Sequence, residues 1–158
     1  MIYIITGKIN QGKTSLAYSV YKSNPIGDGF LAPKMYKDKK FVGYHIEHLT
    51  KGERSPYIYT KNALPENEEV DLQFRNFVFS RRGLRLAEKI INKCIADKIS
   101  PVYIDEIGPV ELFHKKGLHR PFKRLMKTNC DIIVVIRNFL IDRLIDLYGV
   151  RNYKLIKA

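Results

Sequence analysis

The hydrophobic residues follow two alternating patterns along the chain, short continuous runs and longer stretches with helical spacing. The runs at residues 2–6, 102–104 and 132–136 are rich in Ile and Val, which is typical of parallel strands covered on both faces. Apolar residues at steps of three and four predict a helix over residues 82–97. Further helices are expected over residues 13–21, 118–127 and 140–147, and a last strand over residues 153–156. This alternation predicts an α/β fold with a mostly parallel sheet, helices on both faces, and ligands at the carboxyl ends of the strands.

A different pattern occupies the middle of the chain. Residues 27–59 are aromatic and β-branched, interrupted by Gly and charge, and the turn-like segment 37–40 predicts a β-hairpin inserted after the first helix. Residues 61–71 have neither period and are predicted to form a surface loop before a short strand at residues 77–79. With 45% hydrophobic residues and no low-complexity stretch, the chain, residues 1–158, is expected to fold as a single domain.

The segment that joins the first strand to the first helix carries a phosphate-binding motif. Its pattern, Gly-x4-Gly-Lys-Thr, spans residues 7–14 and matches the phosphate loop (Walker A) in full, in the strand–loop–helix context that this loop needs. The two glycines let the backbone fold around an anion, so that successive N–H groups and the helix N-terminus point at a β-phosphate. The residues expected to bind the nucleotide are Gly7, Lys8, Ile9, Asn10, Gln11, Gly12, Lys13, Thr14 and Ser15.

Three side chains of this loop have distinct expected roles. Lys13 is expected to bridge the β- and γ-phosphate oxygens and to act in catalysis. Thr14 is expected to bind Mg²⁺ through its hydroxyl, and Ser15 to contact the α-phosphate. The sequence therefore predicts Mg²⁺ as the cofactor and a nucleoside triphosphate such as ATP or GTP as the ligand.

An acidic pair, Asp105-Glu106, follows the strand at residues 102–104. In phosphate-loop enzymes an Asp at this place holds the Mg²⁺, so Asp105 is the second predicted metal-binding residue. Glu106 is a predicted catalytic residue that would orient, or take a proton from, the water that attacks the γ-phosphate. Solvated acids at the end of a strand are the alternative interpretation.

Arg137 directly follows the strand at residues 132–136 and is the third catalytic candidate. Its guanidinium would reach a γ-phosphate at the same edge of the sheet and stabilise charge in the transition state. A surface arginine in the first turn of the next helix is the alternative.

Residues 104–112, which include Asp105-Glu106-Ile107-Gly108 and Glu111-Leu112, resemble the second signature of a small nucleoside triphosphatase family first known from thermophiles. It is also called the cancer-related nucleoside triphosphatase family. The steps Gly29-Phe30 and Gly43-Tyr44 are similar to the β-rich insertion of that family, so the resemblance covers most of the chain.

The resemblance implies a RecA-like P-loop fold and hydrolysis of nucleoside triphosphates to diphosphate and phosphate, with broad tolerance of the base. It carries the phosphate loop, Asp105 and Glu106 over into the roles given above. The sequence departs from the family at Ile9-Asn10, where the loop commonly has Pro-Gly, and Arg151-Asn152 stands in the reverse order of the family's later Asn-Arg step. Glu111 is expected either to fix the geometry of the Asp-Glu turn or to cap the next helix.

The composition limits the cellular compartment and the kinds of partner that are expected. Only two cysteines occur, and the apolar N-terminal segment is too short for a signal peptide or a membrane span, so a cytoplasmic protein without membrane contact is expected. The formal net charge of +12 favours polyanionic partners. Basic residues at 115–127 could attract nucleic acid or could form a solvated helix face: Lys115, Lys116, Arg120, Lys123, Arg124 and Lys127.

Three functions fit these observations. The first is Mg-dependent hydrolysis of nucleoside triphosphates. The second is a small-molecule kinase on the same core, for which Arg81, Arg82 and Arg85 could form a lid over the phosphates or simply begin a helix. The third is a binding module whose affinity for nucleic acid or protein depends on the bound nucleotide. The oligomeric state and the physiological substrate do not follow from the sequence.

Overall fold

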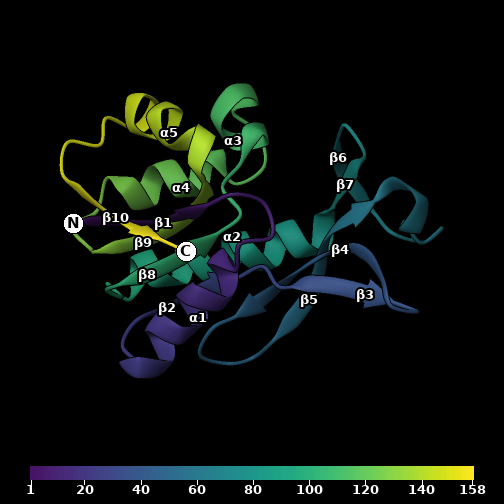
Figure 1. The fold of residues 1–158 in the computed structure, drawn as a ribbon, viewed down its shortest axis with the longest axis horizontal. Helices are drawn as coiled ribbons and strands as arrows, with labels where there is room; N and C mark the ends of the chain where they lie inside the picture. The colour runs from purple at the N-terminus through teal and green to yellow at the C-terminus, as the bar shows by residue number, and fades with distance from the viewer.

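Five parallel strands make up the part of the sheet that contains both chain termini (Figure 1). The computed structural model describes all of residues 1–158. The order of these strands is β10 (Tyr153–Lys157), β1 (Ile2–Gly7), β9 (Ile132–Arg137), β8 (Val102–Asp105) and β2 (Asp28–Leu31). The register pairs Gly7 with Arg137 and Asp105 with Val135, so the predicted loop, acidic pair and arginine begin at one edge of the sheet.

Burial on both faces explains why the three central strands, β1, β9 and β8, are mainly apolar. Ile4 and Ile5 of β1 are fully buried, yet they pack into two separate clusters on opposite faces. The same alternation continues in β9, where Val134 belongs to the larger cluster and Val135 to the smaller one. The apolar residues of these runs therefore contribute to one of two cores.

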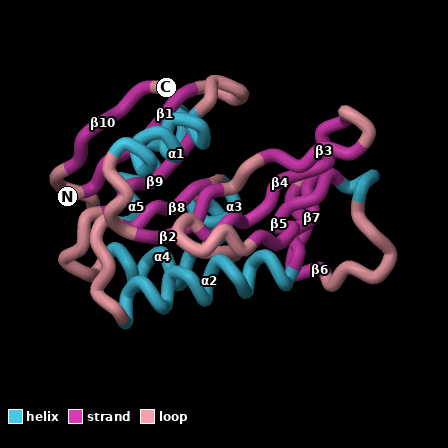
Figure 2. The backbone as a smooth tube through the Cα atoms, turned by 90° about the horizontal axis from the view of Figure 1, so that it is seen from below, coloured by secondary structure: helices cyan, strands magenta, loops and turns pink.

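Helices cover the sheet unequally. α1 (Lys13–Ser23) covers the face of the smaller cluster, to which it contributes Ala17. The opposite face carries the other four helices, and Figure 2 shows the longest of them, α2, running beneath the strands on the side away from α1. These helices are α2 (Arg81–Ala96), α3 (Pro109–His114), α4 (His119–Met126) and α5 (Ile141–Tyr148).

Beyond β2 the sheet continues as an antiparallel extension that projects to one side of the parallel part (Figure 1). Gly43 of this extension has a φ of 145°, and a Cβ there would lie 1.8 Å from the carbonyl oxygen of Ile58, so the close approach of two strands requires glycine. The strands are β3 (Lys34–Lys37), β4 (Lys40–His48), β5 (Arg54–Thr60), β6 (Val70–Phe74) and β7 (Phe77–Ser80). Two short 3₁₀ turns, Lys61–Ala63 and Asn138–Leu140, complete the regular structure.

The predicted α/β fold class is confirmed, with the parallel strands at its centre. The surface loop predicted for residues 61–71 is confirmed for residues 64–69, while a 3₁₀ turn occupies Lys61–Ala63 and β6 already begins at Val70. α3 was not predicted as a helix, because six residues are too few for a helical period to show. The insertion is also larger than one hairpin. None of the helices combines the length and the apolar character needed to cross a bilayer.

Candidate functional site

The phosphate loop has a defined backbone shape. Gly12 has a φ of 77°, and Asn10, at 62°, also lies in the left-handed region, which Asn tolerates better than most residues with a side chain. The Asn10 side-chain oxygen accepts a hydrogen bond from the ammonium of Lys34 in β3. The loop is thus joined to the first strand of the antiparallel extension.

Lys8 is bonded through both of its backbone groups. Its N–H donates to Oε1 of Gln11 at 2.6 Å, and its carbonyl oxygen accepts from Nζ of Lys13 at 2.7 Å. The ammonium group of Lys13 therefore reaches back over the loop. Burial lowers the pKa of Lys13, and the carboxylate of Glu106 acts against that shift. Because the first N–H groups of α1 have no acceptor within the helix, an anion held here would meet both these donors and the ammonium.

A hydrogen bond of 2.6 Å from the Thr14 hydroxyl to Oδ2 of Asp105 connects the loop to the end of β8. The Asp105 side chain is buried, with 1% of its surface exposed, and also accepts from the N–H groups of Ala32 at 3.0 Å and Glu106 at 2.8 Å. Burial raises the pKa of Asp105, while these three bonds and the charge of Lys13 oppose the rise. A hydroxyl and a carboxylate side by side are the hard oxygen ligands that Mg²⁺ prefers, so the two residues predicted to bind the metal fit it.

Glu106 follows with a φ of 66°, a conformation that is rare for residues other than glycine and is concentrated at functional sites. Burial, and then the negative charge of Asp105, raise its pKa to about 7, against the opposing charges of Arg137 and Lys13. A carboxyl group that titrates near neutral pH can exchange protons with a bound water.

Arg137 ends β9 and meets Tyr44 of β4 beside Glu106. Burial raises the pKa of Tyr44 to about 12, the charge of Glu106 adds to the rise, and the charge of Arg137 acts against it. The sequence placed Arg137 correctly at this edge. It left open whether the side chain faced the site or solvent, and the structure brings it to the wall of the cavity.

These groups line a cavity of about 380 Å³ at the carboxyl ends of the strands. All three predicted catalytic residues, Lys13, Glu106 and Arg137, lie on its wall. Four of the predicted site residues, Gly7, Lys8, Gln11 and Asp105, do not line it. Asp105 bonds Thr14, which does, and Gln11 bonds the N–H of Lys8 within the loop. The remaining wall consists of Ile9, Asn10, Gly12, Thr14, Ser15, Ala32, Pro33, Lys34, Tyr36 and Tyr44.

Five residues of this wall were missed from the sequence: Ala32, whose N–H bonds Asp105, and Pro33, Lys34, Tyr36 and Tyr44. Gly43-Tyr44 stood out only as a feature of the insertion. No local pattern tells that β3 and β4 fold back against the phosphate loop, because their position depends on strand pairing far along the chain.

Glu111 is a structural residue of the turn that follows Glu106. Its carboxylate accepts the N–H of Gly108 at 3.1 Å, which caps α3, and the N–H of Leu118 at 3.2 Å, which fixes the start of α4. Burial raises the pKa of Glu111 to about 7. Glu111 therefore does both things expected of it as alternatives: it fixes the turn after Glu106 and it caps a helix.

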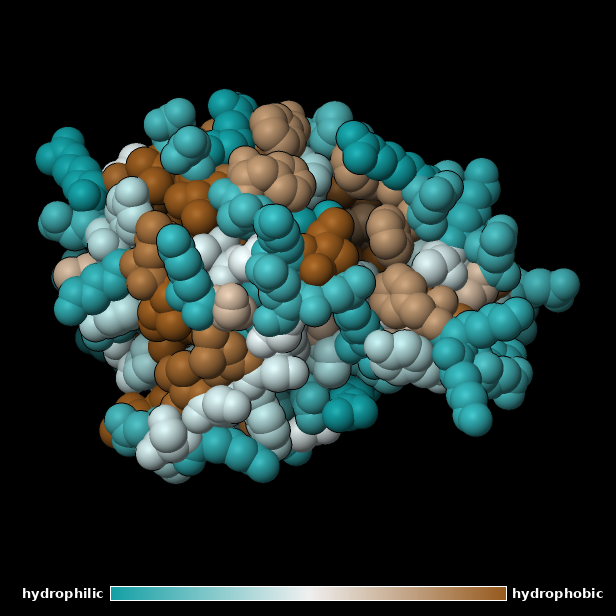
Figure 3. Space-filling model, in the orientation of Figure 1, coloured by the Kyte–Doolittle hydropathy of each residue, from teal (hydrophilic) through white to brown (hydrophobic).

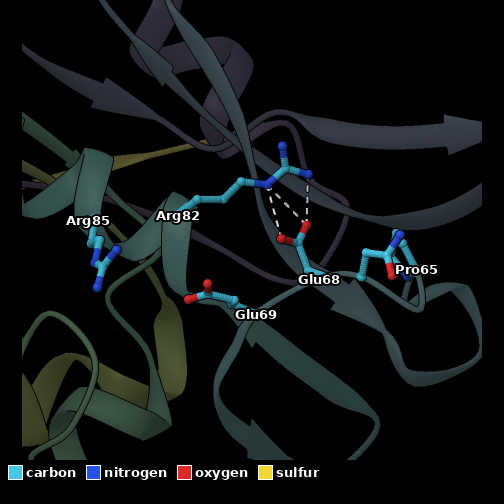
Figure 4. A pocket seen from close by; sticks show the side chains of 6 residues that line it. Pro65, Glu68, Glu69, Arg82 and Arg85 are labelled. Atoms are coloured by element: carbon cyan, nitrogen blue, oxygen red, sulfur yellow. Dashed lines mark hydrogen bonds and ion pairs between the residues drawn. The ribbon is translucent and has the colours of Figure 1, made fainter.

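The arginines considered as a lid lie at the beginning of α2, away from the phosphate loop. Figure 4 shows Arg82 paired with Glu68, at 2.7 Å, in a separate polar hollow that Arg85 also lines. Arg81 pairs with Glu69 at 3.4 Å. These residues begin a helix and close no cavity over the phosphates.

The basic residues of segment 115–127 are exposed, while Leu118, Phe122 and Leu125 of the same segment are buried. Arg124 is held by Asn92 of α2 at 2.6 Å. His119 packs inward and bonds the Tyr148 hydroxyl at 2.9 Å, so it does not belong to the basic surface.

The fold, with its glycine-rich loop between β1 and α1 and its acidic pair after β8, is that of the P-loop nucleoside triphosphatases. The chain belongs to a family described as NTPase, whose sequence profile matches residues 2–158. The resemblance predicted from residues 104–112 is thereby confirmed. No curated protein sequence matches the chain.

Two solved structures share this fold. THEP1 from the hyperthermophile Aquifex aeolicus has a TM-score of 0.74 at 20% identity, over 99% of this chain and 89% of that one. A human cancer-related nucleoside triphosphatase has a TM-score of 0.66 at 21% identity, over 99% of this chain and 87% of that one. Both likenesses extend over the antiparallel extension as well as the parallel strands.

Proposed function

We propose that this protein hydrolyses nucleoside triphosphates, ATP and GTP among them, to diphosphate and phosphate in a reaction that depends on Mg²⁺. The observation that carries the proposal is the 2.6 Å bond between Thr14 and Asp105, since these are the side chains that hold Mg²⁺ in P-loop enzymes. The metal would neutralise charge on the β- and γ-phosphates. The family and the phosphate loop support the substrate class.

In this mechanism the protein's own groups bind and orient the triphosphate. The N–H groups of the loop and of the first turn of α1 hold the β-phosphate, and Ser15 contacts the α-phosphate. Lys13 leaves the Lys8 carbonyl oxygen and bridges the β- and γ-phosphates instead. Arg137 offsets the charge that grows on the γ-phosphate oxygens.

Glu106 acts on the attacking water. Its carboxylate takes a proton from the water as the water oxygen bonds to the γ-phosphorus and the bond to the bridging oxygen breaks, which releases the nucleoside diphosphate. The pKa near 7 supports this role, because a general base works best when its pKa is close to the working pH.

Phosphate release from ATP and GTP, measured with Mg²⁺ and with excess chelator, tests the proposal. Glu106→Gln should keep its affinity for a fluorescent non-hydrolysable analogue and lose activity by about 10² to 10⁴-fold. Lys13→Ala should lose affinity for the analogue as well. Activity that persists in chelator, or in Glu106→Gln, would refute the mechanism.

Nucleotide-gated binding of nucleic acid is a second candidate, supported by the exposed basic side chains of segment 115–127. Fluorescence anisotropy of a labelled single-stranded RNA, with and without the same analogue, tests it. The candidate requires an affinity that changes with the nucleotide and falls when Lys123 and Lys127 are both replaced by Glu.

We also place this activity in the cytoplasm. Cys94 and Cys130 are both free thiols, which supports a reducing compartment.

A further inference from the structure

A second cavity, of about 470 Å³, adjoins the first on the side of Glu106. Tyr44, Glu106 and Arg137 line both cavities and form the wall between them. The rest of the second cavity is largely aromatic, with Phe74, Phe77, Phe79, Phe113 and Phe139 on its wall. Its volume falls within the range of pockets that hold small molecules.

Two large aromatic side chains at this cavity are left open to solvent. Phe113 of α3 is 55% exposed, and Phe139, just after β9, is 65% exposed. Figure 3 shows apolar side chains gathered on this face of the molecule, over α3 and the β6–β7 hairpin, where the surface is hollowed. Exposed apolar groups that gather at one hollow, rather than lying scattered, mark a surface that binds something.

The aromatic walls are held in place by neighbouring cations and rings. The Arg143 guanidinium lies 5.4 Å from the centre of the Phe113 ring, and the Arg75 guanidinium lies 5.3 Å from that of Phe74. The rings of Phe74 and His114 are 5.6 Å apart. A ligand would therefore meet two rings, Phe74 and Phe113, that already have partners, which lowers the entropy that ordering them would cost.

We propose that this cavity binds a small, uncharged aromatic molecule at the same time as the triphosphate occupies the first cavity. The proposal rests on the proposed function, because in that mechanism the γ-phosphate would lie against the shared wall. Five phenylalanines offer faces and edges for aromatic packing. On the shared wall, the Glu106 carboxylate offers hydrogen-bond acceptors and the Arg137 guanidinium offers donors. Because their charges are opposite, the shared wall favours a ligand without net charge. A γ-phosphate beyond that wall would repel an anion.

Titration with N-phenyl-1-naphthylamine, an uncharged aromatic amine whose fluorescence rises in apolar surroundings, tests the proposal. The wild-type protein should bind one molecule. The double variant Phe113→Ser/Phe139→Ser should weaken the affinity about tenfold, because aromatic anchors carry most of the energy of such contacts. Tyr18→Ser is the matched control, since Tyr18 is exposed on α1 at the opposite face and should leave the affinity unchanged.

Two further measurements show which cavity the probe occupies. Binding should persist in saturating Mg²⁺ and a non-hydrolysable GTP analogue, and it should persist in Lys13→Ala. Competition between probe and analogue would place the probe in the nucleotide cavity and overturn the proposal. The Lys13→Ala arm separates the two ideas, because a protein that binds no nucleotide can still bind the probe.

The remaining outcomes concern the nature of the occupant. The anionic relative 8-anilinonaphthalene-1-sulfonate should bind more weakly than the neutral probe once the analogue is present, and equal affinity would refute an uncharged ligand. A dimer of the wild-type protein that dissociates in Phe113→Ser/Phe139→Ser would assign the cavity to a second copy of the chain, and would likewise overturn the proposal.

Discussion

The Thr14 hydroxyl and the Asp105 carboxylate, 91 positions apart in sequence, are joined by a hydrogen bond of 2.6 Å. The bond fixes the N-terminus of α1 against the carboxyl end of β8, so the loop and the acidic pair already lie in the arrangement that a shared cation needs. Sites ordered before their ligand arrives lose less entropy when it binds. The same two side chains therefore contribute to the fold and to the proposed chemistry.

Replacing the Thr14 hydroxyl should separate these contributions. Thr14→Ser keeps the oxygen and should keep most of the Mg-dependent activity. Thr14→Val keeps the shape but leaves Asp105 without one of its three donors, so both phosphate release and the affinity for a Mg-bound nucleotide analogue should fall by at least about tenfold. Titrating Mg²⁺ at fixed analogue concentration measures the effect. Equal Mg²⁺ dependence in the two variants would exclude Thr14 as a ligand.

The rate of hydrolysis should rise with pH across the neutral range. Glu106 must be deprotonated to accept a proton, and burial together with Asp105 raises its pKa to about 7. Below that value kcat/KM, which reports the free enzyme, should therefore fall about tenfold for each pH unit, and above it the profile should level off. Measurements from pH 5.5 to pH 8.5 test this expectation.

The γ-phosphate titrates in a similar range, since a second phosphate pKa lies near 6, so a variant is needed to assign the profile. Glu106→Gln should lose the acidic limb along with most of its activity. If its residual activity keeps a limb at the same pH, the ionisation belongs to the substrate, and the general-base role fails.

Arg137 should act on turnover more than on binding. Its side chain lies on the wall of the nucleotide cavity beside Glu106 and Lys13, where charge grows during phosphoryl transfer. Arg137→Ala should therefore lower kcat by about 10²-fold with little change in KM. Arg120→Ala, which removes an exposed arginine of α4, is the control for the loss of one positive charge. A large rise in KM at unchanged kcat would instead mean that Arg137 only binds substrate.

The parts of the site that the sequence predicted are those encoded over a few adjacent residues. The phosphate loop and the pair Asp105-Glu106 each follow a buried strand, so their pattern and their position at the sheet edge were both readable. Tyr44 was missed because its place on the cavity wall depends on how β4 pairs with β2 and β5. The N–H of Ala32 that binds Asp105 carries no side-chain signal at all.

The errors in the predicted secondary structure have similar causes. The acidic residues around Glu66 masked the alternation of Val70, Leu72 and Phe74, which did indicate a strand and which the structure shows as β6. α3 depends on the carboxylate of Glu111, which accepts the N–H of Gly108, just before α3, and the N–H of Leu118, just before α4. Such a contact follows from the tertiary arrangement rather than from helical periodicity.

Glu111 should make the stability of the protein depend on pH. Its side chain is 1% exposed, and burial raises its pKa from 4.5 to about 7. A carboxyl group whose pKa is higher in the folded state binds its proton more tightly there, so its contribution to the unfolding free energy is full below about pH 4.5 and is lost as the pH rises towards 7. The shift corresponds to a loss on the order of 3 kcal/mol.

Glu111→Gln removes this titration. At pH 5 the wild-type carboxyl is protonated but keeps acceptor capacity on both oxygens, whereas the amide NH₂ of Gln can only donate, so one N–H, of Gly108 or Leu118, loses its partner. At pH 5 the variant should therefore be less stable than the wild type, by about 1–3 kcal/mol. At pH 8 the difference should shrink or change sign, because only the wild type then buries a charge. Urea unfolding at pH 5, 6, 7 and 8 measures the difference, with the exposed Glu66→Gln as the control whose effect should stay constant. A Glu111→Gln difference that is the same at every pH would show that the carboxylate titrates normally despite its burial.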